Sequence, residues 1–179
     1  MNAAKRVRSS CLMVFLLITT ISLQAIPITK TDSDQGVPLR KNSLLSVDDW
    51  SEQDLISFAK KLLGVKYKYG EANPSRGFDC SGFVHYVFGR FGITLPRSSS
   101  AIGKTGQNVP LSDAKAGDII LFTGTNPARR TIGHVGIVLS NNDKALRFIH
   151  ASSGKAKAVT ETALEGSYKN RFMKVIRVI

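Results

Sequence analysis

Three residues of this 179-residue chain have side chains that could carry out nucleophilic catalysis: Cys80, His134 and His150. A cysteine attacks a carbonyl carbon as a thiolate, when a base manages its proton and a third group orients the base. Cys80 follows Asp79 at the predicted start of a helix, where unpaired amides favour a thiolate and can stabilise an oxyanion. These residue types are therefore those of a nucleophile, a base and an orienting group.

The two histidines fall on two predicted strands, 134–139 and 145–151, joined by a turn centred on Asn142. Opposed residues of an antiparallel hairpin lie at equal distances from the turn, so we expect His134 to face His150 directly. Their Cβ atoms would then be about 5 Å apart. A register shift of one residue would place them on opposite faces of the sheet.

Other interpretations of the same residues stay open at this point. Cys80 could be an inert core residue at a helix start. The histidines could be buried polar residues, or zinc ligands together with Cys80. The chain has no closely spaced Cys and His pairs, so we expect no metal. His85 lies about 140° round the helix from Cys80, and we expect a structural role for it.

The elements that must position these residues are predicted as helices followed by strands. Apolar residues recur at helical spacing from Leu55 to Leu63, with Gly64 as the stop, and again from Phe83 to Phe91. Short β-type runs then follow, bounded by turn residues. They are Asp118 to Phe122, His134 to Leu139, Ala145 to Ala151 and Lys174 to Ile179. This order predicts an α+β fold in which N-terminal helices pack on an antiparallel β-sheet.

The N-terminal segment predicts export. Basic residues at positions 5, 6 and 8 precede an apolar stretch at 11–21, and Ala25 is a small residue suited to cleavage, as in a secretory signal peptide. The stretch is too short for a membrane anchor, which needs about 20 apolar residues, so we expect no stable anchor. The expected segments are a signal peptide (1–25), a tether (26–50) and a catalytic domain (51–179).

The net charge of +12 reflects 25 basic and 13 acidic residues. Removal of residues 1–25 would take away three of the basic residues and Cys11, leaving 22 basic against 13 acidic residues, or +9, with Cys80 as the remaining thiol. A basic exported protein suits an anionic envelope. Because the chain has no nucleic-acid module, we expect no nucleic-acid partner, and we expect a monomer.

Six blocks of sequence occur in a defined order along the predicted domain. They are Gly64 to Gly70, Gly77 to Val84, Gly92 to Arg97, Ala116 to Phe122, Gly133 to Val138 and Phe148 to Ala151. Together they resemble the NlpC/P60 cell-wall cysteine peptidases, and the block around Asp79-Cys80 with the downstream block around His134 is the most specific part. Tyr168 to Phe172 is similar to the tail of the compact Spr-type murein endopeptidases.

This resemblance implies a papain-like fold, with Cys80 as nucleophile, His134 as base and His150 as the orienting group. It implies hydrolysis of amide bonds in peptidoglycan stem peptides or cross-links, without a cofactor. Further candidates are Tyr67, Asp79 and Ser81 as oxyanion or active-site support, and Arg97, Tyr69 and Gly133 as substrate-binding residues.

Two departures from the family pattern border the expected cleft. Glu71 stands where the family commonly has a second glycine, and the loop at 123–132 is long and basic. Two other functions also stay open. Lipid acyl transfer would need a large apolar surface near Cys80, and a non-catalytic wall-binding module would not need the three catalytic residue types.

Overall fold

The computed structural model describes residues 50–142 and 145–179. The predicted signal peptide at 1–25 and all of the predicted tether except Trp50 lie outside the described residues. Within the part of the chain that is described, no helix is long and apolar enough to cross a membrane.

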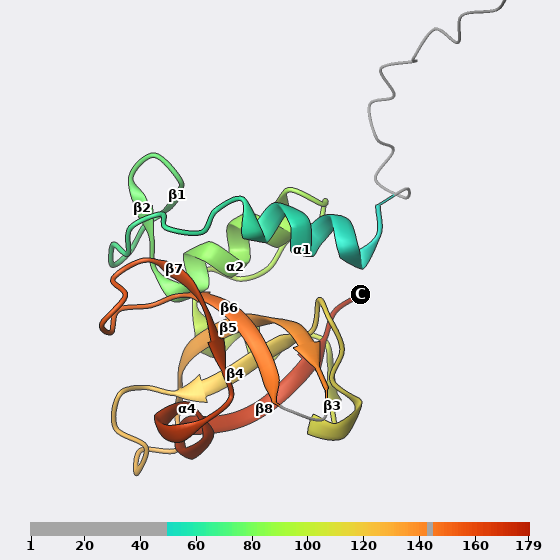
Figure 1. The fold of residues 1–179 in the computed structure, drawn as a ribbon, viewed down its shortest axis with the longest axis vertical. Helices are drawn as coiled ribbons and strands as arrows, with labels where there is room; N and C mark the ends of the chain where they lie inside the picture. The colour runs from blue at the N-terminus through green and yellow to red at the C-terminus, as the bar shows by residue number, and fades with distance from the viewer. Residues whose placement is uncertain (1–49, 143–144) are drawn as a thin grey trace, which may run out of the picture. The chain divides into compact units, whose positions relative to one another are not determined.

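Helices α1 and α2 lie on one side of a large antiparallel sheet, and α4 lies on the other (Figure 1). The helices are α1 (Glu52–Lys60), α2 (Cys80–Gly89), α3 (Ser99–Ile102), the short 3-10 helix η1 (Leu111–Asp113) and α4 (Gly166–Arg171). The strands are β1 (Ala72–Asn73), β2 (Gly77–Phe78), β3 (Gln107–Val109), β4 (Ile119–Thr123), β5 (Ile132–Asn141), β6 (Leu146–Ala151), β7 (Val159–Ala163) and β8 (Phe172–Arg177). In the described residues, β1 and β2 pair as a hairpin, and the other strands form a sheet in the order β3-β8-β4-β5-β6-β7.

The large sheet separates two apolar cores. Between the sheet and helices α1 and α2 lies a core that includes Leu55, Phe83 and Val135. On the other face lies a smaller core that includes Phe122 and Phe148 and is covered by residues of and around α4. The arrangement confirms the predicted α+β fold with N-terminal helices on an antiparallel sheet.

Both predicted N-terminal helices begin where the sequence places them. Ser51 caps α1 through a capping box with Asp54, and Asp79 caps α2 by accepting a hydrogen bond from the amide of Gly82. The first helix ends at Lys60, earlier than Gly64, because the chain from 61 to 64 continues as turns.

The sequence patterns did not reveal β7 or α4. Strand β7 lies at the edge of the sheet, and its residues after Val159 are only partly buried, so polar Thr and Glu side chains are tolerated there. Helix α4 is a short element between β7 and β8, with no apolar periodicity to mark it.

The hairpin of β5 and β6 corrects the predicted register. Ile137 pairs with Ile149, so His134 and His150 are not directly opposed. Extending this pairing places Gly136 opposite His150, and a Cβ built on Gly136 would lie 3.2 Å from the Cβ of His150. The expected pairing was wrong by two residues because β5 continues to Asn141 and β6 begins at Leu146, which moves the turn toward the C-terminus, and the pairing irregularity between Val138 and Ser140 changes the register by one residue. An even shift keeps both histidines on one face.

Candidate active site

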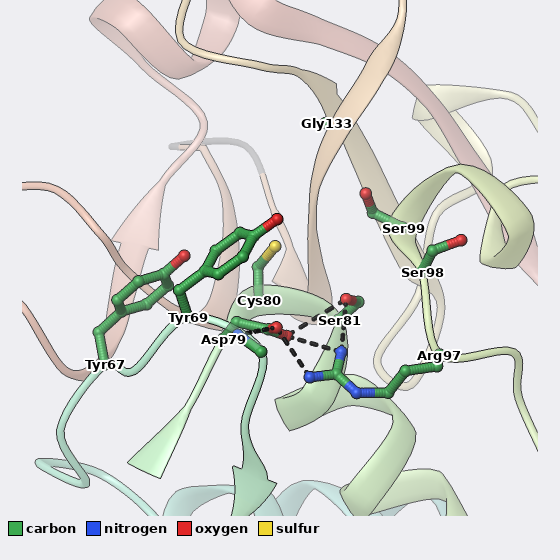
Figure 2. A pocket seen from close by; sticks show the side chains of 10 residues that line it. Tyr67, Tyr69, Asp79, Cys80, Ser81, Arg97, Ser98, Ser99 and Gly133 are labelled. Atoms are coloured by element: carbon green, nitrogen blue, oxygen red, sulfur yellow. Dashed lines mark hydrogen bonds and ion pairs between the residues drawn. The ribbon is translucent and has the colours of Figure 1, made fainter.

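Cys80 is the first residue of α2 and lies in a pocket of about 420 Å³, which we call the Cys80 pocket. Figure 2 shows its side chain pointing from the start of the helix into this pocket. Six of the eight other candidates from the sequence also line it, namely Tyr67, Tyr69, Asp79, Ser81, Arg97 and Gly133, whereas His134 and His150 do not. The structure therefore gathers residues from loops, a helix and a strand that are up to 66 positions apart in the sequence around one thiol.

An ion pair between Asp79 and Arg97 lies beside the thiol (Figure 2). Arg97 Nη1 donates to Asp79 Oδ1 at 2.8 Å, and Nη2 donates to Oδ2 at 2.7 Å. The same two nitrogens donate to the hydroxyl of Ser81 at 3.0 Å and to the carbonyl of Glu71 at 3.1 Å. The terminal nitrogens of Arg97 are thus engaged within the protein, where they hold the start of α2 against the preceding loop.

Asp79 receives two backbone hydrogen bonds in addition to those from Arg97. The amide of Gly82 donates to Oδ1 at 2.7 Å, and the amide of Gly70 donates to Oδ2 at 2.8 Å. Burial works against the ionised carboxylate, but the bonds from Arg97, Gly82 and Gly70 outweigh it and lower the pKa of Asp79. The residue is a carboxylate at neutral pH and anchors the helix start.

The thiol of Cys80 rests in its protonated form. Burial and the nearby charge of Asp79 raise its pKa. Hydrogen bonds from the amides of Ser81, Val135 and Cys80 itself oppose this rise without cancelling it. The hydrogen bonds at the helix start therefore favour the thiolate, as expected from the sequence. Burial and the charge of Asp79 outweigh them, so the protonated thiol is the resting form. The hydrogen bond from the amide of Val135 means that the sulfur lies next to β5, the strand that also carries His134.

The two histidines contact each other directly. His134 Nε2 lies 2.9 Å from His150 Nδ1, and His150 Nε2 lies 3.0 Å from the hydroxyl of Thr162 on β7. In this chain of contacts Nδ1 is the nitrogen of His134 that does not contact His150. Among the described residues, no three His, Cys, Asp or Glu side chains are grouped in a way that could hold a metal ion.

Both histidines are neutral at neutral pH. Burial, His150 and the cation of Arg171 lower the pKa of His134 well below 6.5. Burial and Arg171 lower the pKa of His150 from 6.5 to about 4. A neutral imidazole can accept the proton of a neutral thiol, so this pair is suited to act as a base during attack.

Helix α4 covers the histidine pair. The ring of Tyr168 lies 5.2 Å from that of His150 and 6.0 Å from that of His134, measured between centroids. The guanidinium of Arg171 lies 5.3 Å from the centroid of Tyr168. Reasoning from sequence missed Thr162, Tyr168 and Arg171 as parts of the site. The threonines at 160 and 162 repeat with the period of two that is typical of a β-strand, and this pattern could have indicated Thr162.

Tyr67 lines the Cys80 pocket together with the thiol. Burial, followed by the charges of Cys80, Asp79 and Tyr69, raises the pKa of its phenol, and a hydrogen bond with Ser153 opposes the rise. The phenol therefore stays protonated and can donate a hydrogen bond.

The remaining residues singled out from the sequence lie elsewhere. His85 Nδ1 is 2.6 Å from the carbonyl oxygen of Leu95, and His85 does not line the Cys80 pocket. The side chain of Glu71 pairs with Arg76 and Lys68.

Acidification should destabilise the protein through the histidine pair. An unfolded histidine binds its proton near pH 6.5, whereas His150 does so only near pH 4, so stability present above pH 6.5 is lost as the pH falls toward 4. We expect His150 alone to account for a loss of up to about 3 kcal/mol. Urea denaturation at neutral pH and at about pH 4.5 measures it. The His150→Gln variant has no ionisable side chain at position 150, so its free energy of unfolding should fall less. An equal fall in both proteins would contradict the assignment to His150.

Comparison with known proteins places these residues in a family context. The sequence profile of the NlpC/P60 family matches residues 64–177. The gamma-DL-glutamyl hydrolase of Bacillus subtilis (strain 168) is 39% identical over 124 residues, which are 69% of this chain and 28% of that protein. The murein DD-endopeptidase MepS/murein LD-carboxypeptidase of Escherichia coli (strain K12) is 35% identical over 117 residues, 65% of this chain and 57% of that protein.

A solved structure shows the same fold. The crystal structure of a protein similar to lipoprotein, of the NLP/P60 family, from Staphylococcus aureus subsp. aureus Mu50 superposes with a TM-score of 0.63 and 32% identity. The match covers 74% of this chain and 42% of that one. The chain thus spans less than two thirds of the length of these relatives.

Proposed function

This chain belongs to the NlpC/P60 family, and we therefore propose that it is an exported cysteine endopeptidase that hydrolyses amide bonds in peptidoglycan stem peptides or cross-links. The observation that carries the proposal is the placement of Cys80 at the start of α2, beside the strand of a histidine that bonds to a second histidine. A nucleophile, a base and a group that orients the base are the parts this reaction needs.

The first half of the reaction forms an acyl-enzyme. Cys80 Sγ attacks the carbonyl carbon of the scissile amide while His134, which is neutral, takes the thiol proton. The amide of Cys80 and the phenol of Tyr67 donate to the oxyanion. When the carbon–nitrogen bond breaks, His134 returns the proton to the leaving amine. His150 holds the ring of His134 and stabilises it while it is charged.

The second half releases the product. Water attacks the thioester carbon, and His134 accepts one of its protons. The carbon–sulfur bond then breaks, the new carboxylic acid leaves, and the proton returns to the thiol. Apart from the substrate, the reaction consumes one water molecule.

Arg97 supports this proposal as a positioning residue. It bonds to Asp79 on both carboxylate oxygens, and Asp79 caps the helix that begins with Cys80. Ser81 is a third partner in this network. Tyr69, which is 88% exposed, and Gly133 are candidates for contacts with the peptide at the rim of the Cys80 pocket.

The lining of the Cys80 pocket favours a peptide over a lipid. Asp79, Arg97 and three serines contribute to it. Within the described residues, the exposed large hydrophobic side chains are those of Leu63, Tyr69 and Leu111, and Tyr69 is the one that lines this pocket. An acyl chain would gain little from such a surface.

The proposed place of action is the cell wall, the periplasm or the medium. It would be reached through the predicted signal peptide at 1–25, which lies outside the described residues. The protein is proposed to work there as a monomer, held near an anionic envelope by its positive charge.

Digestion of purified peptidoglycan tests the function. The purified protein should release soluble muropeptides, and mass spectrometry of these products should show a new carboxyl group and a new amino group at one stem-peptide bond. Products cleaved within the glycan strands, or no soluble products in the presence of a reductant, would contradict the proposal.

Thr162 should act as a positioning residue for the histidines. The Thr162→Val variant removes the hydroxyl that bonds His150 Nε2 while keeping the shape of the side chain. We expect kcat to fall by about 10-fold to 100-fold, with little change in KM, because the histidines would sample other orientations. The Thr162→Ser variant should recover most of the activity. A loss confined to KM, or no recovery by serine, would contradict this role.

A further inference from the structure

A second pocket, of about 650 Å³, lies beside the histidine pair. We call it the α4 pocket, because it is lined by residues of α4, of β7 and of the loop between β6 and β7. It shares no lining residue with the Cys80 pocket. Two of its lining residues contact the histidines: the hydroxyl of Thr162 bonds His150 Nε2, and the ring of Tyr168 packs against both imidazoles.

The α4 pocket is cationic. Lys155 and Arg171 line it, and none of its lining residues is acidic. No carboxylate among the described residues pairs with either cation. One terminal nitrogen of Arg171 donates to the carbonyl of Thr123 at 2.9 Å, while its Nε is buried without a hydrogen-bond partner. Arg171 is only partly buried as a whole, but a guanidinium without a carboxylate partner among the described residues attracts an anion.

The Cys80 pocket differs in this respect. Its guanidinium, that of Arg97, is already neutralised by both oxygens of Asp79. A carboxylate on a substrate therefore gains less from Arg97 than from Arg171. The residues Ser152, Thr160 and Ser167 add hydroxyl groups to the α4 pocket, and hydroxyls can donate further hydrogen bonds to an anion.

The position of the α4 pocket relates it to one side of the scissile bond. In the proposed reaction the carbonyl carbon bonds to Cys80, and His134 gives its proton to the leaving amine. The leaving amine must therefore be next to His134. Tyr168, which lines the α4 pocket, packs against the ring of His134 with 6.0 Å between the ring centroids. An amino acid that supplies this amine and extends past His134 would meet the α4 pocket with its two cations, Arg171 and Lys155.

We propose that the α4 pocket binds a carboxylate of the amino acid on the leaving, amine side of the scissile amide, with Arg171 and Lys155 as its cationic partners. This inference rests on the proposed function and adds a specificity to it. The favoured substrates are amides whose leaving amino acid has a free carboxylate, as a diamino acid in a stem peptide can.

Charge at the histidines supports the same conclusion. Arg171 lowers the pKa of both His134 and His150. A carboxylate bound to Arg171 would offset that effect. The bound substrate would then make it easier for His134 to carry a proton to the leaving amine, at the stage where the reaction requires it.

A matched pair of peptides tests the specificity. The two are identical except that the leaving diamino acid carries either a free carboxylate or a primary amide. We expect kcat/KM of the wild-type protein to be about 10-fold higher for the free acid. In the Lys155→Gln variant the preference should fall to about 3-fold, and Lys155→Arg should restore it. The control is Lys157→Gln, because Lys157 is in the same loop but does not line the pocket. Equal rates for both peptides in the wild-type protein would overturn the inference.

A binding experiment separates this inference from the proposed function. The Cys80→Ala protein is titrated with the free diamino acid and with its amide, while NMR follows the signals of Thr162 and Tyr168. We expect the acid to shift these signals and the amide to shift them less. If the wild-type protein cleaves neither peptide but the acid still shifts them, the anion site stands and the proposed hydrolysis fails. Equal shifts by acid and amide would overturn the anion site.

Discussion

The Cys80→Ala variant should lose peptidoglycan hydrolysis by at least about 10⁴-fold while keeping its fold. In the proposed mechanism the sulfur is the protein atom that bonds to the carbonyl carbon of the substrate, and without it no acyl-enzyme can form. The cap on α2 comes from Asp79, so the helix start does not depend on the thiol.

Release of muropeptides, followed by mass spectrometry, measures this loss. The melting temperature of the variant serves as the control for folding, and binding of the variant to purified peptidoglycan shows whether substrate recognition is retained. Equal hydrolysis by the variant and the wild-type protein would refute the mechanism. If neither protein hydrolyses peptidoglycan but both bind it, a non-catalytic wall-binding module is the better description.

The Gly82→Ala variant should be destabilised by about 3 kcal/mol and should lose on the order of 100-fold in activity. A Cβ at this position would lie 2.1 Å from the carbonyl oxygen of Glu71, which is backbone and cannot turn aside. That carbonyl also accepts hydrogen bonds from the amide of Asp79 and from Arg97. Relief of the clash therefore requires α2 to move, and Cys80 moves with it.

Gly89→Ala is the matched control, since Gly89 lies in the same helix and a Cβ there would meet nothing within 4 Å. We expect this variant to keep full activity and to gain up to about 1 kcal/mol, because alanine is the better helix former. Chemical denaturation and initial rates of peptide hydrolysis measure both changes. Similar stability of the two variants would show that the start of α2 is less tightly fitted than the structure indicates.

The start of α2 and the shared face of the histidines were predictable from sequence. A polar cap followed by apolar residues at helical spacing marks a helix locally, so Asp79 and Cys80 could be placed without a fold. Side chains alternate along a strand, so residues an even number of positions out of register stay on one face. The prediction that His134 and His150 share a face therefore held, although their direct opposition did not.

The register itself could not be predicted. It depends on the pairing irregularity between Val138 and Ser140 and on where β5 ends and β6 begins, and the sequence does not mark either. Strand β7 was missed for a related reason: at the edge of the sheet, polar residues such as Thr162 replace the apolar pattern that identifies a strand.

By itself, the sequence determined which residue types are available for catalysis and which elements carry them, because those signals come from neighbours within a few positions. Only the tertiary structure decided what surrounds them. Arg97 reaches Asp79 across 18 positions, and Arg171 approaches the histidines from a helix with no local pattern. Such contacts form when the loops between distant segments close. They, and the burial that accompanies them, decide that the thiol and the imidazoles rest uncharged and that Arg171, a cation with no carboxylate partner among the described residues, lies beside the imidazoles.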